Sequence, residues 1–343
     1  MRVRLKDIAE VTGVSINTVS RSLRDMPDIG ADTKQRVQAV ASELGYLPNI
    51  QARGLVNRRS CTVGLIATEL ANPSRAAMVE ALRQVAMHED YQLVVRGFDG
   101  ESDAGACIRD MVSRGVDGLV IGNISGELAQ NACWPDLQAA AAAGVPFVVF
   151  FEAVSATVNR VGIDYEAIMH ELTRHLITAH GHRAVAYLGV ECEIGRGRGY
   201  LRAMESAGLA ASVQHIPVRG WTVQAAKQGV IDFVAGNRPP AAIVCHNDTA
   251  AFGAMAGLRA CGLEVPGDVA VVGVDNMELS AYTNPPLTTA GTHPTLAAEI
   301  LFRALNDLMS ASEPARAARS IALPVDVFLR ESCGCTRQDQ ASL

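Results

Sequence analysis

The chain has no run of eighteen apolar residues free of charge, although 49% of its 343 residues are hydrophobic. A helix that crosses a bilayer needs about twenty such residues, so no membrane-spanning helix is expected. The N-terminus is charged and lacks the apolar centre of a secretory signal. Most of the eight cysteines stand in apolar runs, such as those at Cys61, Cys107 and Cys245, as buried, reduced thiols do. These absences predict a cytoplasmic protein.

The sequence also lacks a recognisable catalytic or metal-binding constellation. No nucleophile stands beside an identifiable base, and no Cys or carboxylate spacing completes a zinc set with the histidines near residue 180. Cys333 and Cys335 could chelate or oxidise, but a pair with one residue between them is weak evidence. The run 195–199 (Gly-Arg-Gly-Arg-Gly) resembles a phosphate loop only loosely. We therefore predict no catalysis, no metal site and no cofactor. The histidines concerned are His170, His175, His180 and His182.

Net charge is −6, which is unexpected for a protein that binds nucleic acid. Residues 1–60 hold 10 Lys and Arg against 6 Asp and Glu, a balance of +4, and the remainder holds 20 against 30, a balance of −10. Phosphate should repel the acidic part. Only the N-terminal module is therefore expected to bind DNA.

Residues 5–24 read as two short helices joined by a tight turn. Gly13 can take the left-handed conformation that this turn needs, and Ser15 is a good N-cap for a second helix beginning at Ile16. Small Ala9 lets the two backbones approach, and apolar Val19 fills the gap between them. This pattern predicts a helix-turn-helix, whose second helix lies in the major groove of DNA. An ordinary helical hairpin is the alternative.

A third helix is expected over 34–44, capped by Asp32 or Thr33 and ended by Gly45. Residues 50–57 could form a further helix, but Gly54 inside it costs about 1 kcal/mol relative to Ala. Eight residues are also too few for a stable isolated helix. The segment should fold only against a partner, or else serve as a plain linker. The apolar face of the third helix would hold Val37, Val40, Ala41 and Leu44.

From Cys61 onward, short Val/Ile/Leu-rich strands alternate with helices, which predicts parallel sheets covered on both faces. This alternation of strands and helices occurs in two successive series, so two doubly wound units are expected. Expected strands are 63–67, 92–95, 118–121, 145–151, 184–188, 215–218, 242–245 and 269–274; expected helices are 76–87, 106–113, 137–143, 168–179, 199–207, 225–234 and 250–260.

Ligands of such folds lie beyond the carboxyl ends of the strands, so two facing lobes would close on a small molecule. The polar residues that follow apolar strands are therefore candidate ligand contacts, suited to sugar hydroxyls or a purine edge. Structural alternatives are that Asp248 caps the helix beginning near Thr249 and that Asn72 shapes a turn before Pro73. The candidates are Asn72 with Ser74 and Arg75, Asp99, Asn123, Glu152, Arg196, Asn247 with Asp248, and Asp275 with Asn276.

Several motifs together resemble the lactose-repressor/galactose-repressor (LacI/GalR) family of bacterial transcriptional regulators. They are D-I-A-x-x-x-G-V-S-x-x-T-V-S-R from Asp7, E-L-G-Y-L-P-N from Glu43, A-R-G-L from Ala52, R-x-x-G-Y from Arg196, N-D at Asn247 and G-V-D-N from Gly273. The resemblance extends to Arg330-Glu331-Ser332. It implies a helix-turn-helix headpiece on a bilobal, periplasmic-binding-protein-like core.

The resemblance implies the following division. Residues 1–47 would be the headpiece and 48–60 a hinge helix, with 61–335 the effector-binding and dimerisation core and 336–343 a polar tail. The chain would cross between lobes near 160–164, 290–293 and 323–325. The N-lobe would comprise about 61–161 and 292–323, and the C-lobe about 162–291 and 324–335.

The resemblance also implies function. The protein would bind a near-palindromic operator as a homodimer, probe bases through its second helix and respond to an effector, either a sugar or a sugar derivative. Leu55 would wedge into a minor-groove step. No leucine-heptad tail follows the core, which favours a dimer over a tetramer. DNA contacts would be Ser15, Ile16, Asn17, Thr18, Arg21, Asn49, Ala52 and Leu55; effector contacts would be Asn72, Arg75, Asp99, Asn123, Glu152, Arg196, Asn247 and Asp275.

One departure from the family concerns the ligand. Aromatic residues usually follow the Asn-Pro pair in this family, and here Ser74 and Arg75 stand there. With Arg196, this favours a sugar acid or phosphorylated sugar over a stacked neutral sugar or purine. Two other classes stay open. A cytosolic sugar-binding or sugar-modifying enzyme would show turnover, and a DNA-packing protein would bind without sequence preference.

Overall fold

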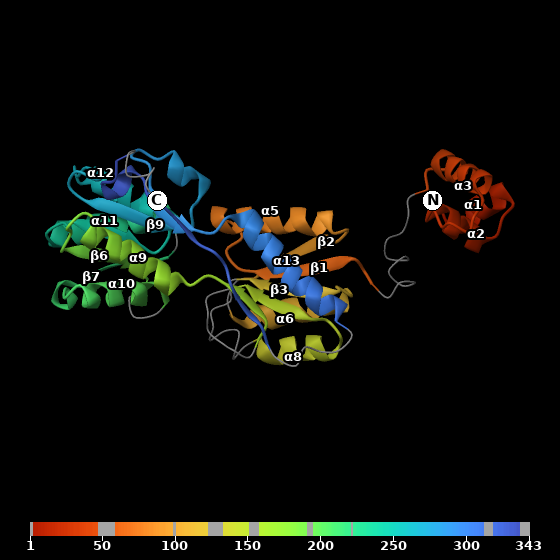
Figure 1. Cartoon of the computed structure of the whole chain (residues 1–343), viewed down its shortest axis with the longest axis horizontal. Helices are drawn as coiled ribbons and strands as arrows, with labels where there is room; N and C mark the ends of the chain where they lie inside the picture. Colours follow the sequence, from red (N-terminus) through yellow and green to blue (C-terminus); the bar gives the residue numbers. More distant parts are fainter. Residues whose placement is uncertain are drawn as a thin grey trace. The chain divides into compact units, whose positions relative to one another are not determined.

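The computed structural model divides into two compact units, Met1–Ser60 and Cys61–Leu343, which we call the headpiece and the core (Figure 1). Within the described residues, no helix combines the length and apolar character needed to cross a membrane. The structure describes residues 3–46, 59–98, 101–122, 133–150, 158–190, 195–220, 222–311 and 318–336.

The headpiece consists of three short helices around one small core. The first ends at the predicted turn, because Gly13 takes a φ of 69° and its N–H donates to the carbonyl of Ala9 at 2.9 Å. Ser15 caps the second by accepting a hydrogen bond from the backbone N–H of Thr18 at 3.1 Å. The predicted helix-turn-helix geometry is confirmed. The helices are α1 (Leu5–Thr12), α2 (Ile16–Leu23) and α3 (Ala31–Glu43).

The predicted start of α3 was wrong. The helix begins at Ala31 with Gly30 as its N-cap, so neither Asp32 nor Thr33 caps it. Gly30 has extended backbone, and its carbonyl accepts the first helical hydrogen bond, from Lys34 N at 3.1 Å. Asp32 lies in the first turn, where a negative charge favours the helix through its dipole.

The headpiece core also differs from prediction at one position. Leu44 is the C-cap of α3 and is 38% exposed, whereas Tyr46, just beyond the turn, packs against the core instead. The chain reverses at Gly45, whose φ is 68°, and this carries Tyr46 back over the helices. The buried residues of this core are Ile8, Val19, Val37 and Ala41.

Two six-stranded sheets form the core, in the orders β11-β5-β4-β3-β1-β2 and β12-β10-β9-β8-β6-β7. We call them, with their helices, the N-lobe and the C-lobe. Neighbouring strands run parallel except β12, which pairs antiparallel with β10 at the sheet edge. The strands are β1 (Thr62–Ala67), β2 (Gln92–Gly97), β3 (Gly118–Gly122), β4 (Phe147–Phe150), β5 (Arg160–Gly162), β6 (Val185–Gly189), β7 (Gln214–Pro217), β8 (Ala242–Cys245), β9 (Ala270–Val274), β10 (Thr288–Gly291), β11 (Ser320–Ala322) and β12 (Asp326–Phe328).

Helices cover both faces of each sheet, as predicted from the apolar strands. Successive strand residues enter different cores: Val244 lies in the cluster beneath α9, whereas Ile243 and Cys245 lie in the cluster beneath α11 and α12. The N-lobe helices are α5 (Pro73–His88), α6 (Glu101–Ser113), α8 (Trp134–Ala142) and α13 (Pro294–Ser310); the C-lobe helices are α9 (Tyr165–Thr178), α10 (Gly195–Ser206), α11 (Val223–Gly236) and α12 (Asp248–Ala260), with short 3₁₀ turns η1 (Ala210–Ser212), η2 (Glu278–Ala281) and η3 (Glu331–Cys333).

The chain passes between the sheets three times. β5 of the N-lobe leads into α9, β10 of the C-lobe leads into α13, and β11 of the N-lobe leads into β12 of the C-lobe. The helix α13 was not among those predicted. It packs against α5, and Tyr91 meets Phe302 of α13 edge to face with ring centroids 5.6 Å apart.

Candidate nucleic-acid interface and ligand site

The N-terminal end of α2 presents two of the predicted base-reading residues to solvent. Ile16 is 49% exposed, and Asn17 beside it is also exposed. Ser15 and Thr18 have a different geometry, because their hydroxyl oxygens lie 2.9 Å apart and Ser15 caps the helix. Ile16 and Asn17 are therefore available to a partner, while Ser15 and Thr18 maintain the helix start.

Arg21 is engaged within the headpiece. Its Nη2 donates to a carboxylate oxygen of Asp28 in the loop after α2, and both side chains are partly exposed. The hydrogen bond from Arg21 lowers the pKa of Asp28. The sequence pattern did not reveal this pair. A base that binds Arg21 must share the guanidinium with Asp28 or replace it.

Several predicted contacts lie outside the described residues. Residues 48–58 of the predicted hinge segment also lie outside them. These contacts are Asn49, Ala52 and Leu55 toward DNA, and Asp99, Asn123 and Glu152 toward the effector.

Arg196 is the centre of the ligand-site candidates in the C-lobe. Its side chain is only 5% exposed, and its guanidinium carbon lies 3.6 Å from the centroid of the Tyr165 ring. Nη2 donates to Oδ1 of Asp275 at 3.2 Å, and Nη1 donates to the backbone carbonyl of His246. The structure therefore brings Arg196 and Asp275 together as a buried ion pair, although they follow β6 and β9, which β8 separates in the sheet.

The glycine-rich run 195–199 forms the first turn of α10 and not a loop. A Cβ on Gly199 would fall on the backbone carbonyl of Glu166 in α9, so glycine is required for the two helices to approach. This packing explains Gly199 without a phosphate. It also fixes Arg196, one residue into the helix.

Asn247 has the capping role that was predicted for Asp248. Asn247 is the N-cap of α12, and its Oδ1 accepts from Ala250 N at 2.8 Å. The expectation that Asp248 caps this helix was wrong, because the helix begins one residue earlier and Asp248 is its first residue. The predicted effector contact Asn247 thus also has a structural function.

Asp248 is fully buried and connects α12 to the loop after β9 and to β10. Its Oδ2 accepts from Met277 N and Ser280 Oγ, both at 2.7 Å, and its Oδ1 accepts from Thr289 Oγ1 at 2.6 Å. Burial, assisted by the charge of Asp275, raises the pKa of Asp248 to about 7. Such a carboxylate belongs to the supporting structure of the site.

The predicted N-lobe contacts stand at the start of α5. Asn72 caps this helix, accepting from Ser74 N at 3.0 Å, so its role in shaping the turn is real. Arg75, in the first turn, has a buried Nε with no hydrogen-bond partner among the described residues. Its charge also acts on the imidazole of His246 in the C-lobe. The guanidinium of Arg75 is therefore close enough to the C-lobe for its charge to help lower the pKa of His246.

His246 and Tyr187 were not among the predicted site residues. Nδ1 of His246 lies 2.8 Å from the hydroxyl of Tyr187, a fully buried strand residue that stacks on His215 and Tyr200. Burial, followed by the charges of Arg196 and Arg75, lowers the pKa of His246 well below its ordinary value. The position of His246 in the sequence could have identified it as a site residue, because it directly follows an apolar strand and precedes Asn247.

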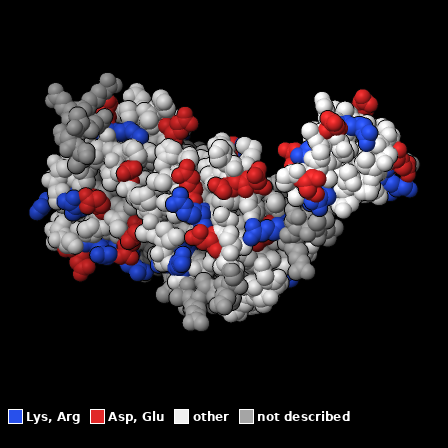
Figure 2. All heavy atoms as spheres, turned by 45° about the vertical axis from the view of Figure 1, so that its right-hand side comes forward, with Lys and Arg blue, Asp and Glu red and all other residues white. Residues whose placement is uncertain are grey.

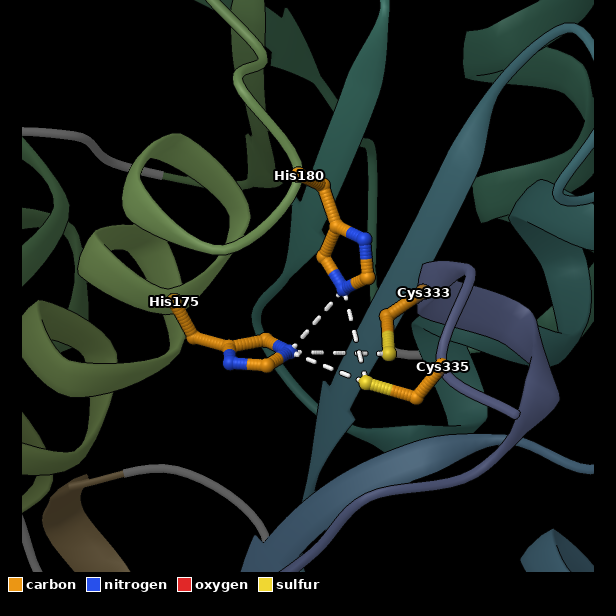
Figure 3. Close-up of side chains that lie close together, drawn as sticks. All are labelled: His175, His180, Cys333 and Cys335. Carbon is orange, nitrogen blue, oxygen red and sulfur yellow. Dashed lines mark hydrogen bonds between the residues drawn. The ribbon is translucent and has the colours of Figure 1, made fainter. Parts of the chain in front are cut away.

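A separate cluster of candidate metal ligands lies in the C-lobe. Two histidines and two cysteines near the C-terminus lie together there (Figure 3). Each side chain offers one ligand atom, and these four atoms lie within 4.8 Å of one another. The cysteines follow the histidines by more than 150 residues, so local spacing did not predict the set. Its members are His175, His180, Cys333 and Cys335.

Surface charge is mixed on both units. Figure 2 shows Lys and Arg interspersed with Asp and Glu on the visible faces of the headpiece and the core. On these faces neither unit carries a broad patch of one sign. We therefore expect DNA recognition to depend on individual side chains and not on the net charge of the headpiece.

Comparison with known proteins gives one consistent result. Residues 4–49 match the model of bacterial regulatory proteins of the lacI family, and residues 173–333 match the periplasmic binding protein-like domain. Catabolite control protein A of Priestia megaterium is 28% identical over 299 residues, covering 84% of this chain and 87% of the relative. The transcriptional regulator GalR of Escherichia coli K12 is 29% identical over 291 residues, covering 83% of each chain.

Solved structures of transcriptional regulators are also similar to this chain. The Lac repressor dimer bound to operator and the anti-inducer ONPF has a TM-score of 0.84 at 26% identity, covering 97% of this chain and 99% of that one. The complex of the transcriptional regulator CelR with cellobiose has a TM-score of 0.66 at 25% identity, covering 96% and 100%. These relatives are regulators and not enzymes, and they share both units of this chain. The chain belongs to the LacI/GalR family of DNA-binding transcriptional regulators, with an effector-binding core.

Proposed function

We propose that the protein is a bacterial, cytoplasmic repressor that binds a near-palindromic operator as a homodimer. The observation that carries this proposal is the folded helix-turn-helix whose second helix exposes Ile16 and Asn17 at its N-terminal end. One headpiece of this size makes too few contacts for genomic specificity, and two related by a two-fold axis match a palindrome. The similarity to an operator-bound repressor dimer supports this arrangement.

Each exposed residue of α2 has a distinct role in the proposal. Ile16 packs on a thymine methyl, Asn17 reads adenine or a neighbouring base, and Arg21 leaves Asp28 to pair with guanine. Ser15 and Thr18 position the helix on the phosphate backbone. The segment 48–60 serves as the hinge between headpiece and core.

The DNA test begins by selecting duplexes from a random pool with the full chain and then titrating the best site. Arg21→Ala should relax preference at one base position by about 1–3 kcal/mol. Arg36→Ala, an exposed cation on α3, serves as the matched control. Equal weakening of all sequences by Arg21→Ala would assign Arg21 to a phosphate and contradict its proposed role.

We propose an acidic sugar, either a sugar acid or a phosphorylated sugar, as the effector, bound between the lobes. Arg196 and Asp275 supply a fixed donor and acceptor pair in the C-lobe, and Asn247 lies beside the carbonyl that Arg196 contacts. The buried, unpartnered Nε of Arg75 favours an anionic group on the ligand. The similarity to a cellobiose-bound regulator supports a sugar framework.

Thermal-shift screening of the full chain against neutral sugars, sugar acids, phosphorylated sugars and nucleobases tests the effector class. Arg75→Gln should weaken binding of the acidic ligand about tenfold or more, as expected for a charge-assisted contact of about 1.5–3 kcal/mol. Arg83→Gln, on an exposed position of the same helix, should leave it unchanged. Stronger shifts with neutral sugars or nucleobases than with acidic sugars would contradict this assignment.

The proposed control of DNA binding acts through the hinge. Effector binding changes the lobe arrangement and so the separation of the paired hinge segments, which alters operator affinity. Leu55→Ala in the full chain should lower operator affinity and leave effector affinity unchanged. Equal loss of both affinities would rule out this route.

A further inference from the structure

Four side chains from two distant parts of the core sequence converge at one point of the C-lobe (Figure 3). His175 lies on α9, His180 follows that helix, and Cys333 ends η3. Both imidazoles point their Nε2 atoms toward the two sulfur atoms. This cluster shares no residue with the effector candidates or with the DNA-binding helix.

Four of the six distances between the ligand atoms match those of a tetrahedral metal site, and the other two are within 4.8 Å. Nε2 of His175 lies 3.2 Å from Nε2 of His180, 3.5 Å from Sγ of Cys335 and 3.7 Å from Sγ of Cys333. Nε2 of His180 lies 3.4 Å from Sγ of Cys335. Tetrahedral Zn²⁺, with bonds of about 2.0–2.1 Å to nitrogen and about 2.3 Å to sulfur, separates two nitrogens by about 3.3 Å and nitrogen from sulfur by about 3.6 Å.

Hydrogen bonding alone does not explain this convergence. A ring nitrogen offers one in-plane position, either a lone pair or an N–H, and so forms one good hydrogen bond. Nε2 of His175 nevertheless has three polar neighbours within 3.7 Å. A cation at the centre allows all four ligand atoms to use their lone pairs at once.

The surroundings suit a closed, structural site. Cys333 is fully buried and Cys335 is 7% exposed, so the sulfur atoms are shielded from solvent. Gly334 between them has a φ of 99°, which turns both cysteines to the same side, and a Cβ there would come within 3.3 Å of Nδ1 of His180. The hydroxyl oxygen of Thr288 lies 3.1 Å from Sγ of Cys333, a typical outer contact of a metal-bound thiolate.

We propose that the protein binds one Zn²⁺ per chain through Nε2 of His175 and His180 and Sγ of Cys333 and Cys335. Two nitrogen and two sulfur ligands in tetrahedral arrangement select zinc over harder cations. Four protein ligands leave no open position, so the ion is structural. It ties the C-terminal segment to α9. Each cysteine loses its thiol proton to solvent when the metal binds.

Metal content tests the proposal directly. The untagged full chain, reduced, incubated with Zn²⁺ and desalted, should retain about one zinc per chain by elemental analysis. Cys335→Ser and His180→Gln should each lower zinc affinity about tenfold or more, with a lower melting temperature. Cys261→Ser and His182→Gln are matched controls outside the ligand set and should retain zinc.

Cobalt provides a readout that needs no variant to fold. Co²⁺ added to the metal-free wild-type chain should give the intense visible absorption of tetrahedral, thiolate-ligated cobalt, and Zn²⁺ should abolish it. Failure to retain zinc, an octahedral cobalt spectrum, equal zinc loss in the two controls, or a Cys333–Cys335 disulfide in the freshly purified protein would each overturn the proposal.

Discussion

The headpiece and the core differ in how far their candidate contact residues are exposed. Around the four buried apolar residues of the headpiece, Ile16 and Asn17 stand in solvent. In the core the candidate contacts Arg196 and Asn247 are themselves buried and hydrogen-bonded to the framework. A change at Ile16 or Asn17 should therefore alter recognition alone. A change at the core contacts should alter recognition and stability together.

The largest expected effect is at Arg196. Arg196→Gln leaves the carboxylate of Asp275 buried without its cation, which should lower the free energy of unfolding by about 3–5 kcal/mol. Urea unfolding of the full chain, followed by tryptophan fluorescence and circular dichroism, measures it. Arg202→Gln on the same helix removes an exposed pair with Glu166 and should cost at most about 1 kcal/mol. An equal decrease in the free energy of unfolding in both variants would contradict the claim that the buried ion pair of Arg196 contributes more stability than the exposed pair of Arg202.

The next effect concerns the small core of the headpiece. Ile8→Ala removes a fully buried side chain and should cost about 2–5 kcal/mol, most of the stability of so small a unit. Operator binding should be lost while the thermal transition of the core is kept. Ile16→Ala is the matched exposed change and should leave headpiece stability within about 0.5 kcal/mol. A core transition shifted by Ile8→Ala would show that the two units do not unfold separately.

Asp248 should make core stability depend on pH. Its pKa rises from 3.8 to about 7 on folding, so the folded chain binds the proton more tightly than the unfolded chain. The stabilisation is complete below the unfolded pKa and is lost as pH rises toward 7, with a slope of about 1.4 kcal/mol per pH unit at most.

Unfolding of the wild type and of Asp248→Asn across this pH range isolates that contribution. The variant should be less stable at every pH, because its amide nitrogen replaces one of the two oxygens that accept hydrogen bonds. Its free energy of unfolding should not show the decrease with rising pH that Asp248 causes in the wild type. Parallel profiles would mean that Asp248 does not titrate between these pH values.

The smallest expected effect is at the cap of α2. Ser15→Ala removes the acceptor for Thr18 N and should destabilise the headpiece by about 1 kcal/mol. Ser42→Ala, on an exposed position of α3, should change it by less than about 0.5 kcal/mol. Hydrogen exchange of the α2 amides measures both. Unchanged protection of α2 in Ser15→Ala would show that the cap contributes nothing there.

Local sequence signals predicted the headpiece well, because each feature depends on a few neighbouring residues. Gly13 and Ser15 set the turn and the cap within four positions of their partners. The start of α3 was wrong because Gly30 caps through its backbone conformation, which side-chain preferences do not reveal. The ion pair between Arg21 and Asp28 depends on how the loop after α2 folds back.

In the core, strand and helix types were predictable, but long-range contacts were not. The short strands β5, β10, β11 and β12 were not predicted. The helix α13 was also missed, although Leu301, Phe302 and Leu305 follow a helical period and are buried. Asp248 is held by partners 29 to 41 residues away, and the cysteine pair meets His175 across 158 and 160 residues. Such contacts follow from the tertiary arrangement of the strands and not from local pattern.

The most direct test of the whole account is an anisotropy titration of the full chain on its selected operator and on a scrambled duplex, with and without the acidic sugar that gives the strongest thermal shift. We expect tight binding to the palindromic site only, with the sugar changing that affinity by about 5–150-fold. Equal affinity for both duplexes, or an affinity that the bound sugar leaves unchanged, would contradict it.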